Sequence, residues 1–99
     1  MFAAIRDPVG MDDIVYRRKA ALLEAPIEGE MVGLDRERGE CFGFNESASD
    51  VWSLLEQPRT FAELSAAMRE RYDVGQEECE RALAGVLDEM VAMKLVAAG

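Results

Sequence analysis

The sequence predicts one α+β domain, in which a small antiparallel sheet of three strands is followed by three helices. Residues 14–44 contain short runs with a two-residue alternation, separated by turn residues. From Asn45 onward, apolar side chains recur at intervals of three and four residues, which is the spacing of helices with one buried face. Strands followed by helices indicate an α+β layout, and the order also suits a winged helix.

The chain is long enough for a single domain and no more, because it has 99 residues. Residues 1–13 include Pro8 and Gly10 and lack any periodicity, so we expect an irregular lead-in there. Residues 14–99 then form the domain.

Short apolar runs and turn residues mark the expected strands. Residues 14–16 and 20–23 flank a basic cluster at 17–19, and Pro26 with Gly29 marks a turn. Residues 30–34 and 40–44 form a hairpin around the polar loop 35–39. We expect this hairpin to present one large apolar face to the helices, made of Val32, Leu34, Phe42 and Phe44.

Capping residues and breakers set the limits of three helices. Asn45 is a good N-cap for the first helix, which Pro58 stops. Thr60 and Glu63 have the spacing of a capping box for the second helix, which ends near Tyr72. The third helix spans residues 76–94, and Leu95 and Val96 pack back on the core. The expected buried faces comprise Ala48, Val51, Trp52, Leu54 and Leu55, then Phe61, Leu64, Met68 and Tyr72, then Cys79, Leu83, Val86, Leu87, Met90 and Val91.

The residue types present argue against catalysis. The chain has no histidine, which is the commonest general base and metal ligand. Its glycines are scattered singly, so there is no phosphate-binding loop. The two cysteines, Cys41 and Cys79, lack neighbours at metal spacing, and we expect both to be buried thiols. The sequence therefore predicts a protein that is not an enzyme and uses no cofactor or metal.

The charge of the chain limits its partners. The formal net charge is −9, which disfavours nucleic acid and anionic membrane surfaces. A basic peptide or protein face would be compatible, although the charge also serves solubility alone. No membrane span or signal peptide is recognisable, so we expect a cytoplasmic protein.

Several segments, taken in order, resemble one known family. The first is 39–46 with Ala48 and 51–55; the later ones are Thr60, Glu63 with Leu64, 72–74, Leu83, 87–90, Leu95 and Val96. Together they resemble the pyrroloquinoline quinone biosynthesis protein D (PqqD) family, and the likeness covers roughly residues 14–96.

The resemblance implies a peptide-binding domain with a winged-helix fold. In that family the leader segment of a ribosomally made precursor peptide binds as an added strand, in the groove against the third helix. The domain then passes the peptide to a modifying enzyme. That enzyme is a radical S-adenosylmethionine enzyme or, in relatives that serve lasso peptides, a leader peptidase and a cyclase.

The expected peptide-binding surface consists of one strand edge and one helix flank. An exposed edge offers backbone groups that a peptide can pair with, and Gly43 would allow close approach. Mid-helix Ala82 and Gly85 either admit the peptide or allow a close helix crossing. Phe42 and Phe44 should pack mainly in the core, so their backbone is the part that binds. The candidates are Glu40, Cys41, Phe42, Gly43, Phe44, Arg81, Ala82, Gly85 and Glu89.

Two other functions remain open from the sequence. A DNA-binding winged helix fits the order of elements but not the acidic third helix. A structural or dimerising adaptor is also compatible, because an open strand edge at 40–44 invites a homodimer.

Overall fold

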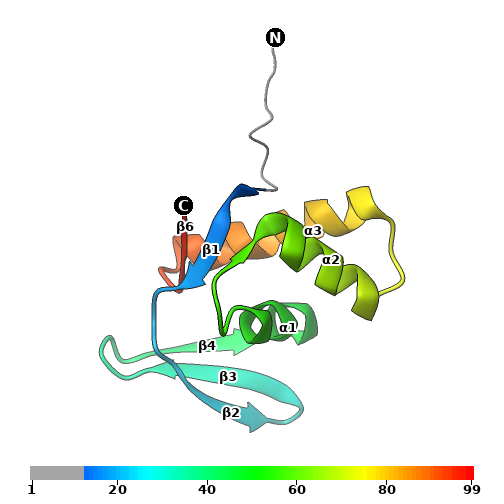
Figure 1. Ribbon diagram of the computed structural model, residues 1–99. Helices are drawn as coiled ribbons and strands as arrows, with labels where there is room; N and C mark the ends of the chain where they lie inside the picture. Colours follow the sequence, from blue (N-terminus) through cyan, green and yellow to red (C-terminus); the bar gives the residue numbers. More distant parts are fainter. Residues whose placement is uncertain (1–12) are drawn as a thin grey trace.

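The computed structural model describes residues 13–99, which form two antiparallel three-stranded sheets and three helices (Figure 1). The α+β class is confirmed, with the sheet β2-β3-β4 ahead of the three helices. The elements are β1 (Val15–Arg18), β2 (Leu23–Ile27), β3 (Glu30–Asp35), β4 (Glu40–Phe44), α1 (Glu46–Leu54), β5 (Arg59–Thr60), α2 (Phe61–Arg71), α3 (Gln76–Ala92) and β6 (Val96–Ala98). The lead-in expected at 1–13 lies outside the described residues, apart from Asp13.

The first hairpin differs from the sequence prediction. The strand expected at 20–23 is wrong, because β2 begins at Leu23 and continues through Pro26, which pairs with Met31. The turn is made by Glu28 and Gly29, which both have positive φ. Proline fits in β2 because, within residues 13–99, that strand pairs with β3 alone, so the missing N–H of Pro26 can face away from the sheet.

The second sheet was not predicted, and it joins the two ends of the described chain. β1 lies between β5 and β6 in the order β5-β1-β6, with Tyr16 opposite both Arg59 and Ala98. The Tyr16 side chain is buried, and its ring lies 6.5 Å from that of Phe61. Leu95 and Val96 are buried, as predicted.

The expected apolar face of the β3–β4 hairpin is wrong. In the observed register Val32 lies opposite Gly43, and Gly33 lies opposite Phe42. Residues paired across two strands point to the same face, so Val32 and Leu34 lie on the face away from Phe42 and Phe44. Phe44 is buried and Phe42 partly buried against the core, while Val32 and Leu34 are half-buried.

The first two helices begin at the predicted caps. The Asn45 side chain accepts a hydrogen bond from the N–H of Ala48 at 2.9 Å. Thr60 and Glu63 form both bonds of the capping box, at 2.8 and 3.1 Å. The predicted core positions of α1, α2 and α3 pack together, with one exception. The prediction that Val91 is buried is wrong, since 39% of its surface is exposed.

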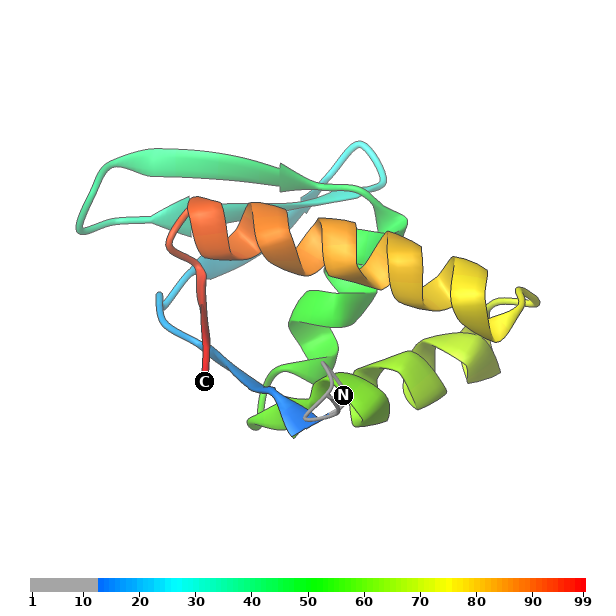
Figure 2. The same cartoon turned by 90° about the horizontal axis from the view of Figure 1, so that it is seen from above.

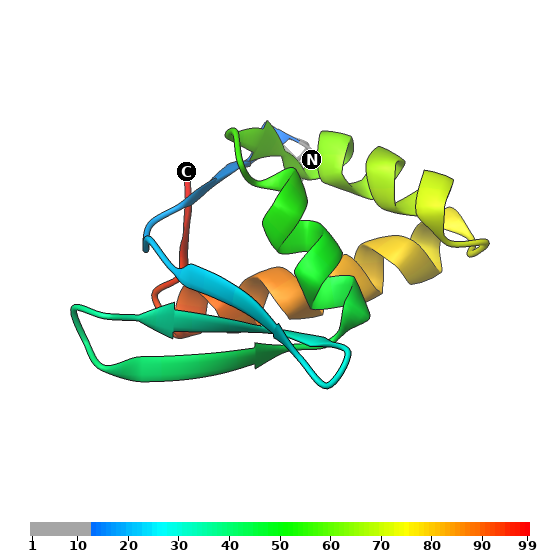
Figure 3. The same cartoon turned by 90° about the horizontal axis from the view of Figure 1, so that it is seen from below.

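The arrangement of α3 matters most for the site. Figures 2 and 3 show the N-terminal half of α3 lying against α2 and its C-terminal half passing over the β2-β3-β4 sheet. In Figure 1, β4 is the strand of that sheet on the side of α3. Among residues 13–99, no helix combines the length and the apolar character that a membrane span requires.

Candidate functional site

β4 is an open edge of its sheet. In the order β2-β3-β4 it pairs only with β3 among the described residues. In an antiparallel pair, alternate residues turn their N–H and C=O groups away from the partner strand. β4 contains no proline, and a Cβ added at Gly43 would meet nothing within 4 Å. The backbone of β4 is therefore available to another strand.

A small hollow of about 90 Å³ separates β4 from the C-terminal half of α3. The backbone and rings of β4 form one wall, and side chains of α3 form the other. Its lining residues are Phe42, Gly43, Phe44, Asn45, Ala48, Val86, Glu89, Met90 and Met93.

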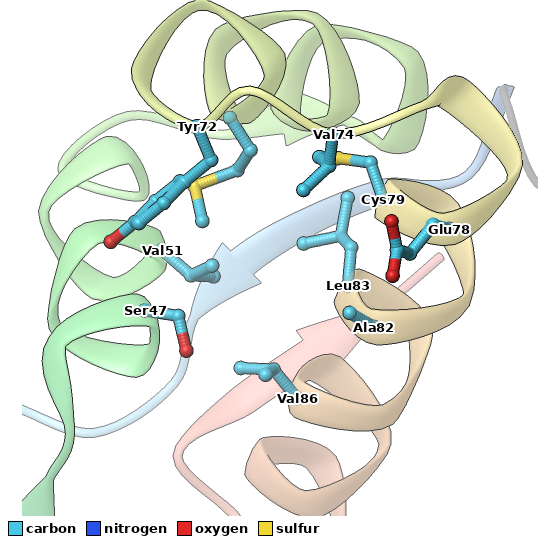
Figure 4. Close-up of a pocket in the computed structure, with 10 residues that line it drawn as sticks. Ser47, Val51, Tyr72, Val74, Glu78, Cys79, Ala82, Leu83 and Val86 are labelled. Atoms are coloured by element: carbon cyan, nitrogen blue, oxygen red, sulfur yellow. The ribbon is translucent and has the colours of Figure 1, made fainter.

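A larger hollow of about 260 Å³ lies next to the first one, between α1, the end of α2 and the N-terminal half of α3. Figure 4 shows Val51 of α1, Val74 of the loop after α2, and Leu83 and Val86 of α3 converging on it. The wall is mostly apolar, and its polar groups come from Ser47, Glu78 and the hydroxyl of Tyr72. The full lining is Ser47, Val51, Met68, Tyr72, Val74, Glu78, Cys79, Ala82, Leu83 and Val86.

The two hollows adjoin at Val86, which lines both. Together we call them the β4–α3 groove. Along α3 its wall runs from Glu78 to Met93, which at the helical rise of 1.5 Å per residue is about 22 Å. The five residues of β4 extend about 17 Å. The smaller hollow lies beside β4, while the larger hollow, whose lining includes no residue of β4, continues the groove between α1, the end of α2 and α3.

The helical wall of the groove carries negative charge. Glu78 and Glu89 are its acidic residues, and neither lining includes a lysine or an arginine. A basic side chain of a bound peptide would meet a favourable field there.

Tyr72 is a fixed part of the larger hollow. Its hydroxyl donates a hydrogen bond to the carboxylate of Asp50 at 2.6 Å, and Arg71 pairs with the same carboxylate at 3.1 Å. This hydrogen bond, together with burial, raises the pKa of Tyr72 to about 12. The hydroxyl therefore stays protonated in neutral solution and keeps the ring in place between α1 and α2.

The structure brings five of the nine predicted site residues into the groove lining. They are Phe42, Gly43, Phe44, Ala82 and Glu89.

The remaining four lie outside these two hollows. Glu40 pairs with Arg38 at 3.2 Å, and Arg81 is exposed, 3.9 Å from Glu77. Cys41 is exposed, which corrects the expectation of two buried thiols, because its position in β4 places it on the face away from the core. A Cβ at Gly85 would meet nothing within 4 Å, so a close helix crossing does not explain that glycine.

The sequence prediction missed several groove residues. Val86 and Met90 were assigned only to the core, and Met93, Tyr72 and Val74 were not site candidates. The signal was present for α3, because Val86, Met90 and Met93 continue the three- and four-residue spacing from Ala82. Across residues 13–99, no three acidic or cysteine side chains are grouped so as to hold a metal ion.

Comparison with known proteins gives one family and two similar structures. Residues 30–96 match the family model of coenzyme PQQ synthesis protein D (PqqD). The structure described as "TbiB1 in Complex with the TbiA(beta) Leader Peptide" aligns with a TM-score of 0.69 and 30% identity, covering 81% of this chain and 93% of that chain.

The structure described as "Lasso peptide synthetase B1 complexed with the leader peptide" aligns with a TM-score of 0.67, covering 83% of this chain and 96% of that chain. At 20% identity, this second likeness shows the fold alone. A search of the curated proteins gives no significant match.

Proposed function

This chain belongs to the PqqD family, and from that premise we propose that it binds the leader segment of a ribosomally synthesised precursor peptide and presents it to a modifying enzyme. The observation that carries the proposal is the open edge of β4 beside the β4–α3 groove. A peptide strand added there would extend the sheet by one strand and obtain main-chain hydrogen bonds from β4.

The groove accounts for side-chain recognition as well. The larger hollow has space and apolar walls for an apolar side chain of the peptide. Glu78 and Glu89 favour basic residues at the positions that pass them. The related protein TbiB1, which is 30% identical, has a leader peptide bound, and this supports the same role for the present chain.

The proposed role is binding without catalysis. The sequence has no histidine, so a general base of the commonest kind is absent. The chemistry would then belong to the partner enzyme. Following the family, we propose a radical S-adenosylmethionine enzyme or a lasso leader peptidase with its cyclase.

A second candidate is self-association, which the same open edge of β4 favours. Two copies would pair through β4 and cover both edges. The net charge of −9 opposes this, because like-charged copies repel. Light scattering at two protein concentrations, with and without peptide, measures the oligomeric state and separates the two functions. A dimer that dissociates when peptide is added would mean that self-association and peptide binding both use β4.

The proposal is tested by titrating fluorescein-labelled leader segments and following polarisation. The probes are the TbiA(beta) leader and the leaders of precursor peptides encoded beside the gene of this chain. We expect saturable binding of at least one neighbouring leader, and none of its scrambled sequence. If no probe binds at concentrations of tens of micromolar, the proposal is wrong. A Kd in that range corresponds to a binding free energy of roughly −6 kcal/mol.

A further inference from the structure

The side chain of Arg38 joins the two walls of the β4–α3 groove at one end. Arg38 lies in the loop between β3 and β4, and its Nη2 donates a hydrogen bond to the carbonyl oxygen of Met93 at 3.1 Å. Met93 is the C-cap of α3. In the described part of the chain, no other hydrogen bond or ion pair connects the β3–β4 hairpin to α3.

The end of α3 leaves that carbonyl available. Leu95 donates its N–H to Met90 at 2.9 Å and Lys94 donates its N–H to Val91 at 3.0 Å, which is the Schellman pattern. These bonds do not use the oxygen of Met93. The last turn of α3 carries no basic residue of its own, so the guanidinium of Arg38 supplies positive charge at the negative end of the helix dipole.

Arg38 is held firmly on its other side. Its Nε donates to Oδ2 of Asp35 at 2.8 Å and lies 3.2 Å from Glu40. Asp35 is buried, and its Oδ1 accepts the backbone N–H groups of Glu37 and Arg38 at 3.0 and 3.2 Å. The guanidinium also lies 5.8 Å from the ring centroid of Phe42, which lines the smaller hollow. These contacts place the guanidinium of Arg38 between the β3–β4 loop and the end of α3.

We propose that Arg38 is a positioning residue that sets the separation of β4 and α3 for an added peptide strand. This inference rests on the proposed function. An added strand must lie about 4.8 Å from β4, with alternate side chains turned toward α3. If the walls are free to separate, the peptide has to bring them together and binds more weakly for that reason.

The first experiment measures the wall separation without any peptide. One spin label is placed on Cys41 of β4, which is exposed, and one on an Ala92→Cys substitution at the end of α3, while buried Cys79 is left in place. We expect Arg38→Gln to lengthen or broaden the distance distribution. The Asp35→Asn variant keeps Arg38 and the charge of its guanidinium but weakens the bond that holds this side chain. We therefore expect a smaller lengthening or broadening of the distance distribution.

The matched control is Arg36→Gln, which removes the same charge from the same loop. Arg36 makes no ion pair within residues 13–99, so the distance distribution of the Arg36→Gln variant should equal that of the parent protein. An unchanged distribution in Arg38→Gln overturns the proposal, whatever happens to binding. Because no peptide is present, this result is independent of the proposed function.

The second experiment measures peptide binding by unlabelled protein. The probes are the leader that binds best and a version of it with every acidic residue changed to its amide. We expect Arg38→Gln to weaken both about tenfold, and Arg36→Gln to weaken neither. Unchanged affinity in Arg38→Gln contradicts the proposal. A loss confined to the acidic probe also contradicts it, because Arg38 would then contact the peptide directly. If the parent protein binds no probe, the proposed function fails, while the distances still decide whether Arg38 sets the separation of β4 and α3.

Discussion

The guanidinium carbon of Arg18 lies 4.2 Å from the centroid of the Trp52 ring, and the same side chain donates hydrogen bonds to the carbonyl oxygen of Trp52. The indole Nε1 of Trp52 in turn donates to Glu24 at 2.9 Å. Arg18 belongs to β1 and Glu24 to β2, so Trp52 of α1 connects the two sheets. This contact fixes the sheet that carries the groove against the rest of the domain.

Replacing Arg18 with methionine should lower the free energy of unfolding by about 1–2 kcal/mol, because the cation over the ring and its hydrogen bonds are lost. Urea denaturation measures this. The control is Arg17→Met, since within residues 13–99 the side chain of Arg17 makes one hydrogen bond, to the carbonyl oxygen of Gly99, and it is long at 3.5 Å. Equal losses in the two variants would mean that the contact with Trp52 contributes nothing specific.

Replacing Gly43 with proline should weaken leader binding about tenfold, because a backbone donor is lost and bulk is added at the edge of β4. The fold should persist in part, which circular dichroism checks. The control is Gly43→Ala, because a Cβ there meets nothing within 4 Å. If Gly43→Pro binds as tightly as Gly43→Ala, the peptide does not use this edge.

Replacing Ala82 with leucine should fill part of the larger hollow and weaken binding of a leader that places an apolar side chain there. Ala82 is exposed, so stability should stay within about 0.5 kcal/mol. The control is Arg81→Leu, one position along α3 and outside both hollows. Polarisation titrations compare them, and a larger effect of Arg81→Leu would place the peptide elsewhere.

The link between Asp35 and Arg38 predicts a pH dependence. Hydrogen bonding from Arg38 holds the pKa of Asp35 below its ordinary value of 3.8, because the charged carboxylate is favoured. A lowered folded pKa means that the stabilisation is complete above the ordinary pKa and disappears as the pH falls through the folded value.

Asp35→Asn should therefore be less stable than the parent at about pH 6, and the difference should shrink toward about pH 2. Urea midpoints across this range measure it, with Glu37→Gln in the same loop as the control. A difference that stays constant with pH would show that the charge of Asp35 has no part in the stabilisation.

Local signals in the sequence were sufficient for the helices. Asn45 caps α1, and Thr60 with Glu63 caps α2, at the predicted positions, because capping depends on residues three positions apart. The short strands β5 and β6 could not be predicted in this way. Two or three residues are too few for an alternation. β6 pairs with β1 because the ends of the described chain meet in space, and β5 pairs with β1 because the segment between α1 and α2 lies beside that strand.

The error in the hairpin has a different cause. Alternation shows which residues share a face within one strand, but the register between strands depends on the loop. Here the loop pairs Asp35 with Glu40, which sets Val32 opposite Gly43 and turns it away from Phe42. The groove was predicted in part for a similar reason, since Tyr72 and Val74 reach it only through the packing of α2 against α3.

The central claim is that a leader peptide pairs with β4, and hydrogen exchange of the backbone amides tests it most directly. β2 is the other edge of the same sheet and serves as the internal control. The account predicts that saturating leader slows exchange at alternate residues of Glu40–Phe44 and leaves Leu23–Ile27 unchanged. Slowed exchange along β2, or unchanged exchange along β4 when the leader is bound, would contradict it.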